Sequence, residues 1–154
     1  MSETRQSPIV SKGKALSSCG DGNRPRVLVV DDETVIADTV VEILCQGGYA
    51  ATAAYDGNSA LETALISPPE LVITDVTLPG MNGIELAITI KRVYPECQVL
   101  LFSGRATTAD LVAAASRAGH RFTLLEKPVP PNLLVEMVAE RLGATSRQPL
   151  ASLD

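Results

Sequence analysis

The stretch that decides the fold is LVITDVTLPGMNG, residues 71–83. Its first four residues form an apolar run typical of a buried strand, and Asp75 ends that run. The segment from Leu78 to Gly83 is too rich in turn-forming residues to be a helix. A carboxylate at the tip of a buried strand is costly unless a site uses it. The stretch therefore predicts a buried strand that delivers a functional aspartate to a loop.

Four more short apolar runs flank this stretch and predict further strands. Together with Leu71–Thr74, the predicted strands are Arg26–Val30, Tyr49–Ala54, Gln98–Phe102 and Phe122–Glu126. Helical periodicity and helix stop signals predict helices at Glu33–Gln46, Asn58–Ile66, Ile84–Val93, Thr107–Ala118 and Pro131–Leu142. Alternating strands and helices predict an α/β fold with a parallel sheet and right-handed crossovers.

The 154 residues suit one domain, expected at 26–142, between a disordered N-terminal tail at 1–25 and a C-terminal tail at 143–154. The net charge of −5 argues against a general nucleic-acid or membrane-surface binder. No run of 18 apolar residues occurs, so no membrane partner is expected. The three cysteines form no C-x-x-C pair, and we expect reduced thiols in a cytoplasmic protein.

The residues just past each strand gather at one edge of a parallel sheet, where sites form. Here they are Asp31-Asp32, Asp75, Ser103 and Lys127. Three close carboxylates repel one another, so they need Lys127 or a divalent cation such as Mg²⁺ as a counter-charge. An Asp in such a setting is a competent nucleophile towards phosphorus. Taken alone, Asp31-Asp32 also suits a helix N-terminus.

Four motifs follow one another along the chain with ordinary spacing: VLVVDDE, VITDVTLPGMNG, LLFSG and LLEKPV. Through them, residues 26–142 resemble the receiver domain of response regulators, the phosphoacceptor module of two-component signalling. The resemblance implies a flavodoxin-like (βα)5 fold, which is a doubly wound five-stranded parallel sheet with strand order 2-1-3-4-5. It also implies Mg²⁺-dependent phosphorylation of Asp75 by a histidine kinase or phosphotransfer protein.

The resemblance also implies a role for each site residue. The implied Mg²⁺ ligands are Asp31, Asp32, Asp75 and the backbone carbonyl of Thr77. Ser103 would bond the phosphoryl group through its hydroxyl, and Lys127 would contact it as a cation. The bond from Lys127 to Pro128 would be cis, a form found in only about 5–6% of X–Pro bonds.

Three further positions are implied to modulate the site or its output. Thr77 and Arg105 lie where the family tunes the lifetime of the phosphoryl group. Leu124 stands three residues before Lys127, where the family usually has its switch aromatic. The only aromatic nearby is Phe122, so either the last strand is offset or the usual coupling of hydroxyl and ring is absent.

We expect a signalling switch that changes its protein contacts on phosphorylation, with a downstream protein that the sequence does not name. It would catalyse only its own phosphorylation and dephosphorylation. The alternatives are an Mg²⁺-dependent phosphatase for small substrates and a binding module that no longer uses phosphate. About twelve residues follow Leu142, which predicts a stand-alone receiver without a DNA-binding output domain. A weak homodimer through the last helix and strand is possible.

Overall fold

The computed structural model describes residues 23–104, 113, 116, 119 and 122–143. Three sequence predictions fall wholly or mostly outside these residues: the helix Thr107–Ala118 apart from residues 113 and 116, Arg105, and most of both tails. The domain limits 26–142 therefore stay a prediction.

Five parallel strands form one sheet, and their order is β3-β2-β4-β5-β6. This is the predicted order 2-1-3-4-5, and it confirms the doubly wound α/β fold. The strand bounds agree with the sequence prediction within one residue: β2 is Arg26–Val30, β3 Ala50–Ala54, β4 Leu71–Asp75, β5 Gln98–Ser103 and β6 Thr123–Glu126.

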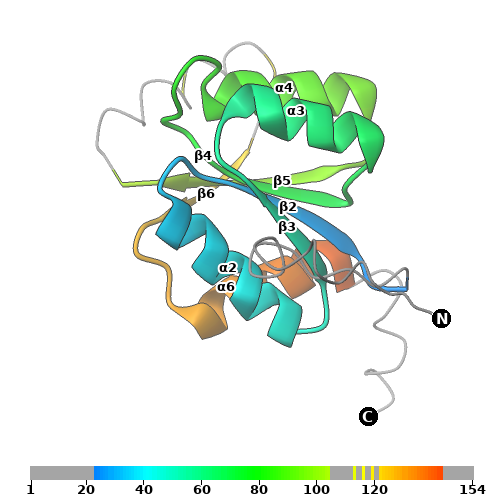
Figure 1. Ribbon diagram of the computed structural model, residues 1–154, viewed down its shortest axis with the longest axis vertical. Helices are drawn as coiled ribbons and strands as arrows, with labels where there is room; N and C mark the ends of the chain where they lie inside the picture. The colour runs from blue at the N-terminus through cyan, green and yellow to red at the C-terminus, as the bar shows by residue number, and fades with distance from the viewer. Residues whose placement is uncertain (1–22, 105–112, 114–115, 117–118, 120–121, 144–154) are drawn as a thin grey trace, which may run out of the picture.

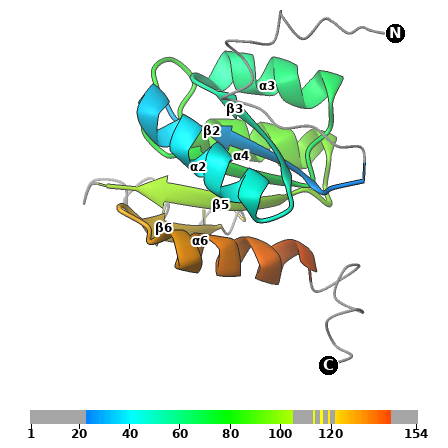
Figure 2. The ribbon, with the colours of Figure 1, turned by 60° about the horizontal axis from the view of Figure 1, so that its bottom comes forward.

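Helices cover both faces of the sheet, so the molecule has three layers (Figure 1). In the continuously described segments 23–104 and 122–143, the α-helices are α2 (Thr34–Gln46), α3 (Gly57–Ile66), α4 (Gly83–Val93) and α6 (Pro131–Val138). Alternate residues of β2 point into opposite layers. Val27 and Val29 pack in the core that includes α2 and α6, while Leu28 and Val30 pack in the core with α3 and α4. The turned view shows α6 beneath β5 and β6 (Figure 2).

The last helix differs from the prediction of one helix over Pro131–Leu142. The α-helix ends at Val138, and a π-helix continues over Ala139–Gly143. Leu134, Val138 and Leu142 are all buried in one core and are four residues apart. Because an α-helix has 3.6 residues per turn, this spacing drifts around its axis, and a wider final turn keeps Leu142 on the buried face.

Two further observations concern the cysteines and the membrane. Cys97 is a buried free thiol, whereas Cys45 is disulfide-bonded. The expectation of reduced thiols therefore agrees with Cys97 and is wrong for Cys45. Among the helices that the structure describes, none combines the length and apolarity needed to cross a bilayer.

Candidate functional site

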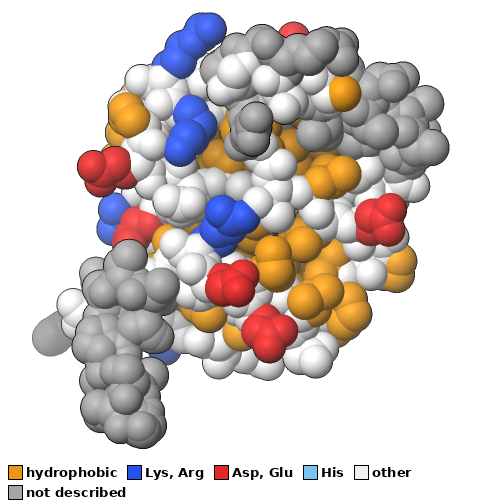
Figure 3. Space-filling view, turned by 180° about the vertical axis from the view of Figure 1, so that it is seen from behind, with side chains coloured by type: hydrophobic (Ala, Val, Ile, Leu, Met, Phe, Trp, Pro, Cys, Tyr) orange, Lys and Arg blue, Asp and Glu red, His pale blue; other side chains and the backbone are white. Residues whose placement is uncertain are grey.

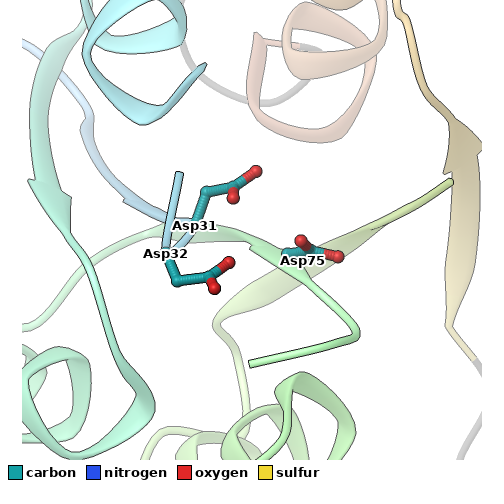
Figure 4. Close-up of side chains that lie close together, drawn as sticks. All are labelled: Asp31, Asp32 and Asp75. Atoms are coloured by element: carbon teal, nitrogen blue, oxygen red, sulfur yellow. The ribbon is translucent and has the colours of Figure 1, made fainter. Parts of the chain in front are cut away.

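Three aspartates converge at the carboxyl edge of β2 and β4 (Figure 4). Asp31 directly follows β2, and Asp75 is the last residue of β4. Asp31 and Asp75 are buried, with exposed fractions of 1% and 8%, whereas Asp32 is exposed. Each of the three offers one carboxylate oxygen, and these oxygens all lie within 4.8 Å of one another. The strand order therefore brings together carboxylates that are more than 40 residues apart in the chain.

Lys127 is the cation of this cluster. Its Nζ donates hydrogen bonds to Asp31 Oδ2 at 2.8 Å and to Asp75 Oδ2 at 3.1 Å. Glu33 Oε1 lies 3.8 Å from the same nitrogen. The backbone N–H of Lys127 donates to the carbonyl of Ser103, which fixes the lysine to the end of β5. One ammonium thus contacts carboxylates from two different strand ends.

Burial and pairing shift two pKa values in the cluster. Burial raises the pKa of Asp75 above its usual value, and the hydrogen bond from Lys127 offsets only part of that rise. Burial alone would lower the pKa of Lys127, but the hydrogen bonds to Asp31 and Asp75 outweigh it and the pKa is raised. The ammonium is therefore firmly charged at neutral pH, while the Asp75 carboxylate is held in an unfavourable environment.

Backbone groups hold the two buried carboxylates in place. The N–H of Thr77 donates to Asp75 Oδ1 at 3.2 Å, and the N–H of Glu33 donates to Asp31 Oδ1 at 3.0 Å. The helix α2 starts at Thr34 with Glu33 as N-cap, and no side chain makes a cap hydrogen bond there. The geometry therefore does not support the alternative interpretation of Asp31-Asp32 as the cap of this helix.

The loop after β4 packs tightly against the strand end. Gly83 donates its N–H to the carbonyl of Val76 at 2.9 Å. A Cβ on Gly83 would lie 2.0 Å from the carbonyl oxygen of Asp75, so only glycine fits without a shift. Asn82 and Glu85 form a capping box at the start of α4, which fixes this end of the loop. The loop thus packs against the backbone of Asp75 and restrains it.

A pocket of about 240 Å³ opens beside the cluster. Its lining residues are Asp32, Glu33, Asp75, Thr77, Gly104 and Lys127. Carboxylate oxygens are the ligands that hard divalent cations prefer, and Mg²⁺ keeps waters on its open positions. With carboxylate oxygens within 4.8 Å of one another, the side chains present fit such a cation.

The family described as response regulator receiver domain matches residues 27–139. The chain belongs to this family. Receiver domains generally bind Mg²⁺ at an acidic pocket, and Asp31, Asp32 and Asp75 form an acidic cluster in this receiver domain. Receiver domains also interact with histidine kinases or phosphotransfer proteins.

Individual relatives agree with the family. The chain is 37% identical over 123 residues to the nitrogen assimilation regulatory protein NtrX of Azorhizobium caulinodans, covering 79% of this chain and 26% of NtrX. It is 34% identical over 128 residues to the probable transcriptional regulatory protein TcrX of Mycobacterium tuberculosis, covering 83% of this chain and 52% of TcrX. The receiver domain thus spans about a quarter to a half of these two relatives.

A solved structure agrees with the fold. The chain is similar to a CheY-like response regulator receiver domain protein from Methanospirillum hungatei, with 28% identity and a TM-score of 0.73. The match covers 82% of this chain and 99% of that one.

Ser103 and Pro128 lie where the resemblance implies. Ser103 is the last residue of β5 and is buried, with 5% exposure. The bond between Lys127 and Pro128 is cis. Both residues stand at the same edge of the sheet as Asp75, because β5 pairs with β4 on one side and β6 on the other. Their functional roles stay predictions.

The structure decides between the two explanations for Leu124. In the β5–β6 ladder, Leu124 pairs with Leu101 and Glu126 pairs with Ser103, so Lys127 follows in register and the strand is not offset. Leu124 is 36% exposed. Phe122 precedes β6 and packs against the core cluster of Val76, Ile84, Ala87, Val99 and Leu101. No aromatic side chain among the described residues of β6 therefore takes the switch position.

Two residues of the site were missed at the sequence level. Glu33 lines the pocket and approaches Lys127, and its only signal was its place directly after Asp31-Asp32. Gly83 approaches the backbone of Asp75 closely, whereas the sequence marked it only as the last residue of the turn-rich segment from Leu78 to Gly83 before the predicted helix.

Proposed function

We propose that this receiver domain is a phosphorylation-dependent signalling switch that accepts a phosphoryl group on Asp75. The observation that carries the proposal is the cluster itself, in which Lys127 Nζ contacts Asp31 and Asp75 at 2.8 and 3.1 Å. The donor would be a histidine kinase or a phosphotransfer protein, the partners typical of the family. Beyond its own phosphorylation and dephosphorylation, we propose no enzymatic activity.

The charges of the cluster support a role for Mg²⁺. Three ionised carboxylates and one ammonium leave two negative charges uncompensated, which one divalent cation neutralises. We propose that Asp31, Asp32 and Asp75 hold the ion, with the backbone carbonyl of Thr77 as a further ligand. The bound ion would supply charge neutralisation for the incoming phosphoryl oxygens.

The residues of the chain would divide the remaining work. A carboxylate oxygen of Asp75 attacks phosphorus, and the bond from phosphorus to the donor breaks with its electron pair leaving on the donor. Lys127 is placed to contact a phosphoryl oxygen, since its ammonium already touches an Asp75 oxygen. We assign the Ser103 hydroxyl to a second phosphoryl oxygen, because β5 ends beside Asp75.

A second candidate function is a binding module that does not respond to phosphate. It is favoured by one observation, the absence of an aromatic ring at position 124 with Phe122 packed elsewhere. In that case phosphorylation would occur without changing partner affinity. Unchanged affinity for a partner with and without a beryllofluoride mimic of the phosphoryl group would favour this second candidate.

The output of the switch stays open to experiment. The relatives TcrX and NtrX are named as regulators, and this chain spans only part of each. The face opposite the view of Figure 1 carries a group of hydrophobic side chains with acidic side chains beside it (Figure 3). The predicted weak homodimer, the cytoplasmic location and the absence of direct nucleic-acid contact all stay predictions.

The test is covalent labelling followed by intact mass measurement. We expect Mg²⁺ with acetyl phosphate to add one phosphoryl group to the native chain and none to Asp75→Asn. Asp56→Asn is a matched control, because Asp56 caps α3 and Asn caps helices equally well. Labelling of Asp75→Asn at the native level, or no labelling of the native chain with Mg²⁺, would overturn the proposal.

A further inference from the structure

Glu33 stands at the rim of the pocket, where its backbone is fixed and its side chain is largely exposed. It is the N-cap of α2, and its carbonyl accepts hydrogen bonds from the N–H groups of Ile36 and Ala37 at 3.0 and 3.1 Å. Its own N–H is bonded to Asp31. The side chain is 64% exposed, yet it lines the pocket beside Asp32 and Asp75. The carboxylate therefore sits at the entrance, not inside.

The distances place this charge close to the reacting atoms. Glu33 Oε1 is 3.8 Å from Lys127 Nζ, and that nitrogen is 3.1 Å from Asp75 Oδ2. The two carboxylate oxygens are thus at most about 7 Å apart, which is within one Debye length at physiological salt. A phosphoryl donor at Asp75 therefore lies near a negative charge that the proposed Mg²⁺ ligands do not include.

We propose that Glu33 is a specificity-determining residue that disfavours free anionic phosphoryl donors. The inference rests on the proposed function of Asp75. Repulsion by Glu33 grows with the negative charge of the donor. A protein donor that brings a cationic side chain against the exposed Glu33 carboxylate replaces this repulsion with an attraction. The chain would then take its phosphoryl group from a protein partner in preference to small acyl phosphates.

Two small phosphoryl donors of different charge distinguish electrostatic repulsion by Glu33 from other effects of substituting this residue. Acetyl phosphate is a dianion at neutral pH; Asp75 attacks its phosphorus, the bond from phosphorus to the acetate oxygen breaks, and acetate leaves with the electron pair. Phosphoramidate is a zwitterion with one net negative charge; its bond from phosphorus to nitrogen breaks instead, and ammonia leaves with the electron pair. Both reactions produce the same aspartyl phosphate, so only the charge and leaving group of the donor differ.

Coulomb's law gives the size of the effect. At about 7 Å in a water-like dielectric, one pair of unit charges changes a rate about threefold. Removing the Glu33 charge should therefore raise the rate about threefold with phosphoramidate and about eightfold with acetyl phosphate, at low ionic strength and saturating Mg²⁺. A general change in structure would alter both labelling rates by a similar factor. A rise in the acetyl phosphate rate relative to the phosphoramidate rate therefore reports on the charge of Glu33.

The experiment compares Glu33→Gln with Glu42→Gln in labelling rates with both donors. Glu42 is an exposed residue of the same helix, about 13 Å further along its axis, so its substitution changes the net charge equally without reaching the pocket. Mg²⁺ affinity is measured separately by calorimetric titration without a donor. We expect Glu33→Gln to weaken Mg²⁺ binding while it speeds labelling, and we expect Glu42→Gln to do neither.

The outcomes distinguish this inference from the proposed function. If the native chain is not labelled on Asp75, the proposed function fails first. If the native chain is labelled but Glu33→Gln changes both donors equally, or changes neither, the charge selectivity of Glu33 is refuted. Slower labelling together with weaker Mg²⁺ binding would also refute it, because this would make Glu33 a metal-supporting residue only.

Discussion

Replacing Gly83 with alanine tests whether the loop after β4 positions the phosphoryl acceptor. The new Cβ would lie 2.0 Å from the carbonyl oxygen and 2.8 Å from the carbonyl carbon of Asp75. Real Cβ atoms keep at least about 3 Å from such atoms, so strand end and helix must separate by about 1 Å. The capping box of Asn82 and Glu85 and the buried Ile84 restrain α4. Much of the shift therefore falls on the backbone of Asp75.

The magnitude follows from two costs. Overpacking of this kind costs about 1–3 kcal/mol, and weakening the hydrogen bond from Gly83 N–H to Val76 adds about 1 kcal/mol. We therefore expect Gly83→Ala to lower the free energy of unfolding by about 2–4 kcal/mol in urea titrations. A displacement of about 1 Å at a reacting group costs about 100-fold in rate. The labelling rate with phosphoramidate should fall by that order.

Gly80 offers the matched control within the same loop. Its φ is +74°, and a Cβ there would meet nothing within 4 Å. Gly80→Ala should therefore cost about 1–2 kcal/mol through backbone strain, with little change in the labelling rate. The reasoning is refuted if Gly83→Ala keeps native stability. It is also refuted if the two variants lose stability but label at the same rate.

Three further predictions concern the charges of the cluster in the absence of Mg²⁺. Asp75→Asn should raise the free energy of unfolding at pH 7, on the order of 1 kcal/mol, because it removes a buried charge whose pKa is raised; an unchanged or lower urea midpoint would contradict this. Because the pKa of Asp75 is raised on folding, the folded chain binds this proton at a higher pH than the unfolded chain does. The stability deficit of the native chain relative to Asp75→Asn should therefore shrink as the pH falls towards 3.8, the usual pKa of the group; a stability difference that does not change with pH would contradict this. Lys127→Met should destabilise the chain by about 2 kcal/mol by leaving Asp31 and Asp75 without their cation, and Mg²⁺ should restore most of the loss in thermal melts; a loss that Mg²⁺ leaves untouched would point to packing instead.

Local sequence signals predicted the elements well because each signal acts within one element. The apolar run Arg26–Val30 is a strand at the predicted residues, since parallel strands covered on both faces are continuously apolar. Gly47 ends α2, as the Gly47-Gly48 signal predicts. The bounds of α6 were less predictable, because the choice between a further α-turn and a π-turn depends on how Leu142 meets the core and not on local propensity.

The candidate site likewise has a part that the sequence predicted and a part that it did not. The strand-end rule predicted that Asp31, Asp75 and Lys127 meet, because parallel strands place their carboxyl ends at one edge. The rule did not predict the role of Gly83, which allows the start of α4 to approach the end of β4 closely. Such a contact depends on the tilt of a helix relative to a strand, which no local pattern encodes.

The position of Leu124 shows what a motif leaves undetermined. The sequence allowed two explanations, an offset strand or a missing ring, and only the ladder of β5 and β6 separates them. With the register intact, Phe122 precedes β6 and lies two residues before the switch position. If the Ser103 hydroxyl moves toward a phosphoryl group, no aromatic ring at position 124 can move with it. A conformational response in this chain would have to travel through groups that touch Asp75 directly, and these include Lys127, Thr77 and Gly83.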